Sequence, residues 1–270
     1  MMNLYQYRLL LGVTVRSALR DRILQALLGV AGLMFLLVPV FSLFSMRQVQ
    51  ELGVTLALSS ISVTLLLLAI FLGATSIWRD IERRYTSSVL GLPLSRAGYV
   101  LGKFAGIASF LFLGTLVLGA VALLVIPLVA HQYPSSTPIP WFNIIAAIIG
   151  DGLKAVLIAA VALFFSSLST SFFLPVFGTL AVYLVGSASQ EVIEFVRGDY
   201  GSQLAPLSRW LIEALYYLLP NLTAFDFKVQ AIYALPLEFS SLFLVLAYFV
   251  VYTSAVLFLA VWTFRRRELL

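Results

Sequence analysis

The stretch VTLALSSISVTLLLLAIFLGATSIW, residues 54–78, decides the class of this protein. It contains no charged side chain, and about 20 apolar residues suffice to cross the ~30 Å hydrocarbon core of a bilayer. Of the 270 residues, 61% are hydrophobic and 11% are charged, and the mean hydropathy is +1.03. Soluble domains average about 45–50% apolar and about 25% charged residues. The composition therefore excludes a soluble globular domain, a disordered chain and a coiled coil, and it predicts an integral membrane protein.

The apolar segments on either side of this stretch predict an all-α membrane protein with six transmembrane helices. The least obvious region is 144–186, where the only charges are Asp151 and Lys154. At about 1.5 Å per residue this region is roughly 65 Å long, enough for two crossings. The polar run SSLSTS, residues 166–171, marks the turn between them. The six predicted spans are residues 23–44, 54–78, 104–130, 144–165, 172–187 and 240–264.

The basic residues predict the orientation of the chain. Twelve of the 17 Lys and Arg residues lie before the first span, between spans two and three, or after span six. Cytoplasmic loops carry the excess of Lys and Arg. We therefore expect both termini and the loop 79–103 in the cytoplasm, and the segment 188–239 outside.

Two amphipathic elements are predicted outside the spans, one before span one and one between spans five and six. Apolar residues at helical spacing in 1–22 predict an interfacial elbow helix, with a simple cytoplasmic extension of span one as the alternative. In the segment 188–239, leucines recur three or four residues apart until Pro220, which predicts an amphipathic helix on the outer leaflet or dipping into it. These leucines are Leu204, Leu207, Leu211, Leu215 and Leu218.

Several kinds of chemistry are missing from the chain. There is no cysteine and only one histidine, His131, which excludes a zinc site built from His and Cys. The stretch GYVLGKF, residues 98–104, is one residue too short for a phosphate loop, and Phe104 stands where magnesium binding needs Ser or Thr. We therefore expect no metal, no cofactor and no enzymatic activity in this chain.

The loop IWRDIERRYTSSVLGLPLSRAGYVLGK, residues 77–103, carries the most information about function. Its ends are charged, and its middle holds Val89, Leu90, Leu92 and Leu94 around Pro93. A loop that only joined two spans would not need these apolar residues. The pattern indicates a surface for a cytoplasmic protein partner, and the alternative is a helix lying against the lipid headgroups.

This loop resembles the one between spans two and three of ABC-2 type transporter permeases. That family has an acid and basic residues, an apolar run, P-x-S-R and a closing G-K. Tyr85 stands where the family usually has Thr, and the opening TVRSALRDR, residues 14–22, also resembles the start of these permeases. The matching residues are Glu82, Arg83, Arg84, Pro93, Ser95, Arg96, Gly102 and Lys103.

The resemblance implies a permease subunit in the inner membrane of a bacterium or archaeon, with no nucleotide-binding domain of its own. Two permeases, identical or related, would pair with two copies of a separate ATPase subunit, among membrane lipids and without nucleic acid. Most members of the family are exporters. The loop would couple the ATPase to transport, through Arg79, Glu82, Arg83, Arg84, Pro93 and Arg96.

Asp151 and Lys154 support a rival hypothesis. They lie three residues apart, so they share one face of a helix and can partly neutralise each other. A structural pair is one interpretation, and contact with a substrate is the other. Contact with a substrate would indicate a secondary transporter or channel, because such proteins place ionisable residues inside the membrane. A membrane-embedded enzyme would need a cluster of His, Asp or Glu near one membrane face, and the sequence offers none.

Overall fold

The computed structural model describes residues 12, 15–45, 48–82, 95–131, 138–198 and 205–267, and within these ranges the chain is helical with no strand. Six of the described helices are long and apolar enough to cross a membrane, which confirms the all-α class and the number of spans. The elbow helix predicted for 1–22 lies largely outside the described residues. The six helices are α2 (Arg22–Ser42), α3 (Val49–Glu82), α5 (Arg96–Ala130), α6 (Trp141–Leu168), α7 (Phe173–Arg197) and α10 (Phe239–Arg266).

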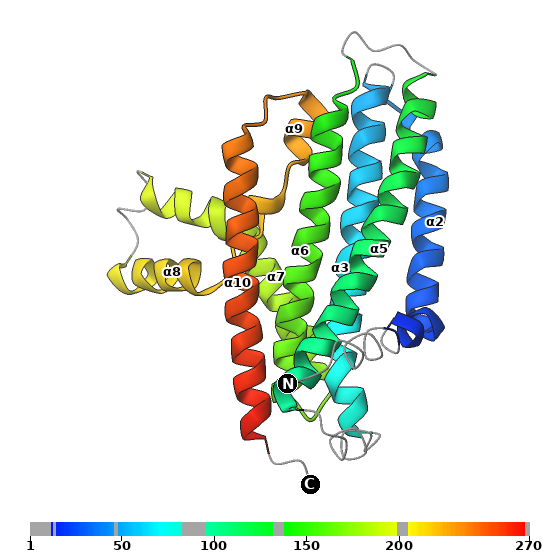
Figure 1. Ribbon diagram of the computed structural model, residues 1–270. Helices are drawn as coiled ribbons and strands as arrows, with labels where there is room; N and C mark the ends of the chain where they lie inside the picture. Colours follow the sequence, from blue (N-terminus) through cyan, green and yellow to red (C-terminus); the bar gives the residue numbers. More distant parts are fainter. Residues whose placement is uncertain are drawn as a thin grey trace.

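Helix α6 forms the centre of the bundle, with α3, α5, α7 and α10 packed against it (Figure 1). In the most apolar 18 residues of α6, 89% of the residues are buried. In the most apolar 18 residues of α10, 11% of the residues are buried. Small residues permit this close packing. A side chain at Gly73 of α3 would collide with Ala162 of α6, and one at Gly152 of α6 would lie 2.8 Å from Thr115 of α5.

The two longest of the described helices are α3 and α5. With 34 and 35 residues they extend about 50 Å each, against a hydrocarbon core of ~30 Å. Helix α5 starts at Arg96, where the side chain of Ser95 accepts a hydrogen bond from the Gly98 amide at 3.1 Å. The predicted span begins only at residue 104, so the extra turns of α5 lie toward the loop that joins it to α3.

Helix α7 also exceeds its predicted span, which ends at residue 187, because it continues to Arg197. In these extra turns Ile193 and Val196 are buried, which explains why the helix does not stop at residue 187. The amphipathic helix predicted after it is present as α8 (Pro206–Leu218), and Pro206 occupies its first turn, where proline is tolerated. None of its residues is buried. Figure 1 shows α8 to one side of the bundle, level with the middle of α10.

Residues 219–235 return from α8 to the bundle, and we call them the strap. The strap contains the short helices η2 (Thr223–Phe225) and α9 (Lys228–Tyr233). Phe225 and Ala231 are fully buried, and η2 packs on both α6 and α7. Asn143 of α6 donates hydrogen bonds to the carbonyls of Gln230 and Leu235, each at 2.8 Å. The strap is therefore part of the packed bundle.

Candidate functional site

The first candidate site is the end of the bundle where α3 finishes and α5 begins, and we call it the loop end. The C-terminus of α10 and the turn between α6 and α7 lie at the same end (Figure 1). A movement of the loop 83–94 would reach the bundle through the last turns of α3 and the first turns of α5. The contacts that these turns make therefore decide what the site can do.

Ionic contacts tie the end of α3 to two other helices. Arg79 Nη1 lies 2.6 Å from Asp21 Oδ2, and Asp21 caps the N-terminus of α2 by accepting from the Ile23 amide at 3.0 Å. The next residue, Asp80, lies 2.6 Å from Lys103 Nζ of α5 and also accepts a hydrogen bond from the Tyr99 hydroxyl. The final turns of α3 are thus fixed to the start of α2 and to the second and third turns of α5.

Arg96 ties α5 to α10. Its Nη1 donates to the carbonyls of Arg265 and Arg267, at 2.9 Å each. The last four carbonyls of a helix have no partner within the helix, so Arg96 supplies one for the C-terminus of α10. Arg267 in turn donates to the carbonyl of Ser167, at 3.0 Å, near the end of α6. The positive charge of Arg96 also suits the negative end of the α10 dipole.

Trp78 joins the end of α3 to the turn between α6 and α7. Ser166 donates to the Ala74 carbonyl at 2.8 Å and accepts from the Trp78 amide at 3.0 Å. The Trp78 indole donates to the Thr170 carbonyl at 3.2 Å. The polar run that marks a turn in the sequence therefore also binds α3. Together these contacts link the loop-end segments of all the long helices except α7 itself.

The pKa of Asp21 reflects its pairing with Arg79. Burial raises the pKa of this carboxyl, but the hydrogen bond and the charge of Arg79, with the Ile23 amide, outweigh burial. The net result is a pKa below the ordinary value for an aspartate. Asp21 is thus a charged partner at neutral pH, and its carboxylate stabilises the loop end.

The structure describes three of the six residues that the sequence analysis assigned to coupling. Glu82 is exposed in the last turn of α3, whereas Arg79 and Arg96 make the internal contacts given above. Arg83, Arg84 and Pro93 lie outside the described residues. The sequence analysis missed the partners Asp21, Asp80 and Tyr99. An acid among the arginines of 16–22 was the available signal for Asp21.

The second candidate site is the buried pair of α6. Lys154 Nζ lies 3.0 Å from Asp151 Oδ1, and the Asp151 side chain is only 2% exposed. Ser62 of α3 donates a hydrogen bond to the other carboxylate oxygen of Asp151. A buried charge needs a partner and hydrogen bonds, and Asp151 has both. Ser62 could not be singled out from the sequence, because it is one of several hydroxyl residues in its span.

The strap carries an acid of its own, Asp226, whose carboxylate lies 3.9 Å from Lys228 Nζ. Its side chain is 38% exposed, whereas that of Lys154 is 11% exposed. The acid of the strap is therefore much more exposed than the two charges of the buried pair.

An apolar cavity of about 320 Å³ lies between α7 and α8. Its lining includes Leu184, Val192, Ile212 and Leu215. Such a lining suits an apolar group and offers little to an ion. Within the described part of the chain, no group of three or more His, Cys, Asp or Glu side chains could hold a metal ion.

Comparison of the sequence with models of protein families gave no match, and comparison with curated proteins gave none either. The class that the fold defines is an α-helical, multi-pass membrane protein, on the basis of six helices long and apolar enough to span a bilayer. A more specific function depends on the two candidate sites.

Proposed function

We propose that this protein is the permease subunit of an ATP-driven ABC-2 type transporter, and that it works as an exporter. Two permeases, identical or related, pair with two copies of a separate ATPase in the inner membrane of a bacterium or archaeon. ATP hydrolysis takes place in the partner, and the loop 79–103 receives the movement on the cytoplasmic side. This chain needs no cofactor for that role.

The observation that carries this proposal is the interlocked loop end. The exposed Glu82 lies two residues from Asp80 and three from Arg79, which fix α3 to α5 and α2. A force applied to the tip of α3 therefore acts on several helices at once. Helices α3 and α5 are longer than the hydrocarbon core is thick, which leaves length for this tip to extend into the cytoplasm, where a partner can reach it.

Charge reversal at Glu82 tests the proposal. Glu82→Arg should weaken binding of the ATPase subunit and lower its stimulated ATP turnover in reconstituted membranes, because a partner arginine or amide loses its acceptor. The same change would strengthen binding to anionic headgroups, so it separates a protein contact from a lipid contact. Glu238→Arg is the matched control, since Glu238 is also exposed and lies at the opposite end of α10.

Unchanged binding and turnover in both Glu82→Arg and the combined Arg83→Ala, Arg84→Ala variant would remove the loop from the mechanism. Copurification with a tagged ATPase encoded beside this gene is the first step, and its failure would count against the whole proposal.

The buried pair supports a second candidate, a secondary transporter or channel with Asp151 and Lys154 at its ion site. Ionisable residues inside a membrane commonly mark ion pathways. Transport that depends on a proton or sodium gradient, and proceeds without ATP, would favour this candidate over the permease.

A further inference from the structure

One side of the C-terminal half of α10 is exposed. The packed side holds the buried residues Thr253, Val256, Ala260 and Phe264. On the other side, exposed residues recur three or four positions apart, so they share one face of the helix. We call this face the α10 stripe, and its residues are Val251, Ala255, Phe258, Trp262 and Arg266.

The α10 stripe is apolar until its last residue, which is a cation. Phe258 is 69% exposed and Trp262 is 45% exposed. From Ala255 to Arg266 the stripe is about 17 Å long at about 1.5 Å per residue, close to one half of a ~30 Å hydrocarbon core. Tryptophan and arginine are typical of the boundary between the core and the headgroups. The stripe therefore has the length and the polarity of one phospholipid in one leaflet.

Trp262 holds the guanidinium of Arg266 in place. Arg266 Cζ lies over the indole, 4.1 Å from the ring centroid. An indole offers no hydrogen-bond acceptor, and among the described residues Arg266 forms no ion pair. The N–H donors of Arg266 therefore remain available, and their fork matches the oxygens of a phosphate group.

The negative end of the α10 dipole does not oppose an anion at this place. Free carbonyls at the C-terminus of a helix repel negative charge. Here Arg96 donates to the carbonyls of Arg265 and Arg267, at 2.9 Å each. A phosphate on Arg266 would therefore meet positive charge on the helix end.

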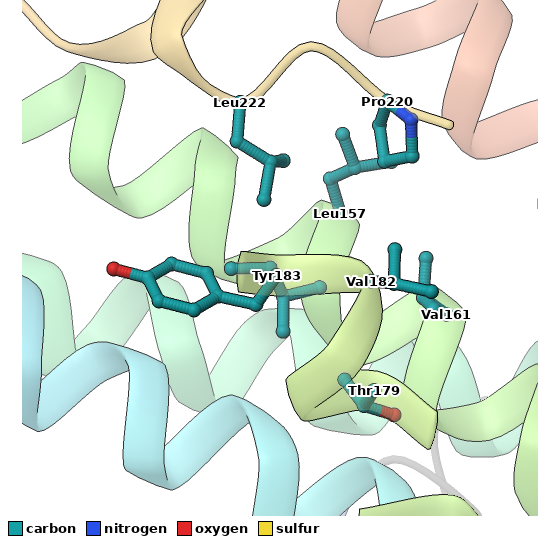
Figure 2. Close-up of a pocket in the computed structure, with 8 residues that line it drawn as sticks. Leu157, Val161, Thr179, Val182, Tyr183, Pro220 and Leu222 are labelled. Atoms are coloured by element: carbon teal, nitrogen blue, oxygen red, sulfur yellow. The ribbon is translucent and has the colours of Figure 1, made fainter. Parts of the chain in front are cut away.

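The interior of the bundle offers an acyl chain no place between α6 and α7. Figure 2 shows Pro220 and Leu222 of the strap lying over Leu157 and Tyr183. The gap that these residues line has no room for a water molecule. An acyl chain would therefore have to lie outside this part of the bundle.

Two glycines bring the strap this close to α6 and α7. A Cβ at Gly150 would collide with the Phe225 carbonyl oxygen, and a Cβ at Gly186 of α7 would lie 2.5 Å from the Pro220 carbonyl oxygen. A backbone carbonyl cannot move aside by changing a rotamer. The close packing of the strap thus depends on two positions without a side chain.

We propose that the α10 stripe binds one anionic phospholipid of the leaflet at the loop end. Its phosphate lies on Arg266, and an acyl chain follows the stripe past Phe258. This site requires only that the chain spans a membrane, so it does not depend on an ATPase partner. The bound lipid would attach the leaflet to the turn of α10 that Arg96 ties to α5.

Native mass spectrometry measures the site directly. The purified, delipidated protein in an uncharged detergent is titrated with dioleoylphosphatidylglycerol or with dioleoylphosphatidylcholine. The first phosphatidylglycerol should bind at least about tenfold more tightly than the first phosphatidylcholine, because Arg266 favours a net negative headgroup. Inorganic phosphate at the same concentration should not displace it, since phosphate has no acyl chain to lie along the stripe.

Substitutions at Arg266 and Trp262 separate this site from a general attraction of arginines to anionic lipid. Arg266→Lys keeps the charge but loses the fork of donors, and Trp262→Leu keeps the charge but loses the ring under Arg266. Each should weaken phosphatidylglycerol binding about fivefold. Both side chains are exposed, so the variants should unfold at the native temperature in the absence of lipid.

Arg265→Lys and Trp141→Leu are the matched controls. Arg265 is exposed at the same end of α10, and Trp141 is 42% exposed at the start of α6. Both control variants should bind phosphatidylglycerol as the native protein does.

Three results would overturn the proposal. Equal binding by the native protein, Arg266→Lys and Trp262→Leu would show that the stripe is not the site, and equal weakening in the controls would leave only a general electrostatic attraction. Displacement by inorganic phosphate would show that the acyl chain contributes nothing. A lipid-free dimer that Phe258→Ala dissociates would show that a second copy of the chain covers the stripe.

Discussion

Arg79 and Asp21 form an ion pair at 2.6 Å between the last turns of α3 and the cap of α2. The two residues are 58 positions apart in the chain, and each serves a second purpose. Asp21 caps its own helix, and Arg79 stands three residues before the exposed Glu82. The pair therefore connects the N-terminus of the first span with the part of α3 that we propose to contact the ATPase.

This pair predicts a dependence of stability on pH. The pKa of Asp21 is lower in the folded protein than its ordinary value of about 3.9, so folding favours the carboxylate. The stabilisation is present above the unfolded-state pKa and is lost as the pH falls through the folded-state pKa. Asp21→Asn should therefore lower the melting temperature at pH 7, by an amount corresponding to about 1 kcal/mol.

Thermal unfolding in detergent between pH 3 and pH 7 measures this effect. The difference between the native protein and Asp21→Asn should shrink toward the acid end of the range. A constant difference across the range would show that the charge of Asp21 contributes nothing, because the asparagine side chain keeps the oxygen that caps α2.

The second prediction concerns Arg96. Arg96→Ala removes both hydrogen bonds to the end of α10 and should cost about 1 kcal/mol or more in unfolding free energy. The last turn of α10 should also become more accessible to proteases. Arg266→Ala also removes a positive charge near the C-terminus of α10, and among the described residues Arg266 stacks on Trp262 at 4.1 Å, so it is the matched control.

Arg96→Lys is expected to restore less than half of the loss, because a single ammonium cannot reproduce the planar guanidinium. If Arg96→Ala and Arg266→Ala have the same effect, the positive charge matters and the hydrogen-bond geometry does not.

The third prediction concerns the buried pair. Lys154→Gln leaves the Asp151 carboxylate without its cation and should destabilise the protein by about 3–5 kcal/mol, as for other broken buried pairs. Asp151→Asn with Lys154→Gln removes both charges and should be milder than either change alone. Unfolding in detergent, with expression in the membrane as a second readout, tests both statements.

A folded double variant also separates the two interpretations of the pair. If it is folded and binds the ATPase but no longer supports transport, Asp151 and Lys154 act on the substrate or on an ion. If it retains transport, the pair is structural.

The fourth prediction is topological. An impermeant thiol reagent should label Ser202→Cys in intact cells and should not label Ser87→Cys. The asymmetry of the Lys and Arg residues motivates this expectation. Labelling of Ser87→Cys alone would reverse the orientation, and with it the side on which the ATPase binds.

The fold class could be predicted from the sequence because a bilayer-spanning helix needs a long apolar run, and six such runs are visible. The ends of helices α3, α5 and α7 could not be predicted from the sequence. These helices continue past the apolar runs into residues that tertiary contacts stabilise. Ile193 and Val196 of α7 are examples, because they are buried although they lie beyond the predicted span.

The residues of the two candidate sites also differ in whether they can be recognised from the sequence. Asp151 and Lys154 stand out because charges are rare in an apolar run, and their spacing alone suggests a pair. The partners of Arg96 are backbone carbonyls about 170 residues away, and a carbonyl has no signature in a sequence. The role of Gly150 and Gly186 could not be predicted either. A glycine in an apolar helix looks the same in a sequence whether it faces lipid or a backbone carbonyl.

The central position of α6 has a consequence for how the protein is made. As α6 leaves the ribosome it carries two charges that the lipid does not accept. By then α3 has already been synthesised. Ser62 can therefore bind Asp151, and Gly73 can pack against α6, as soon as α6 enters the membrane. The strap is synthesised later, and α10, which also packs on α6, is synthesised last. In the order of synthesis, α3 is therefore available to cover α6 first, and the strap and α10 complete its covering.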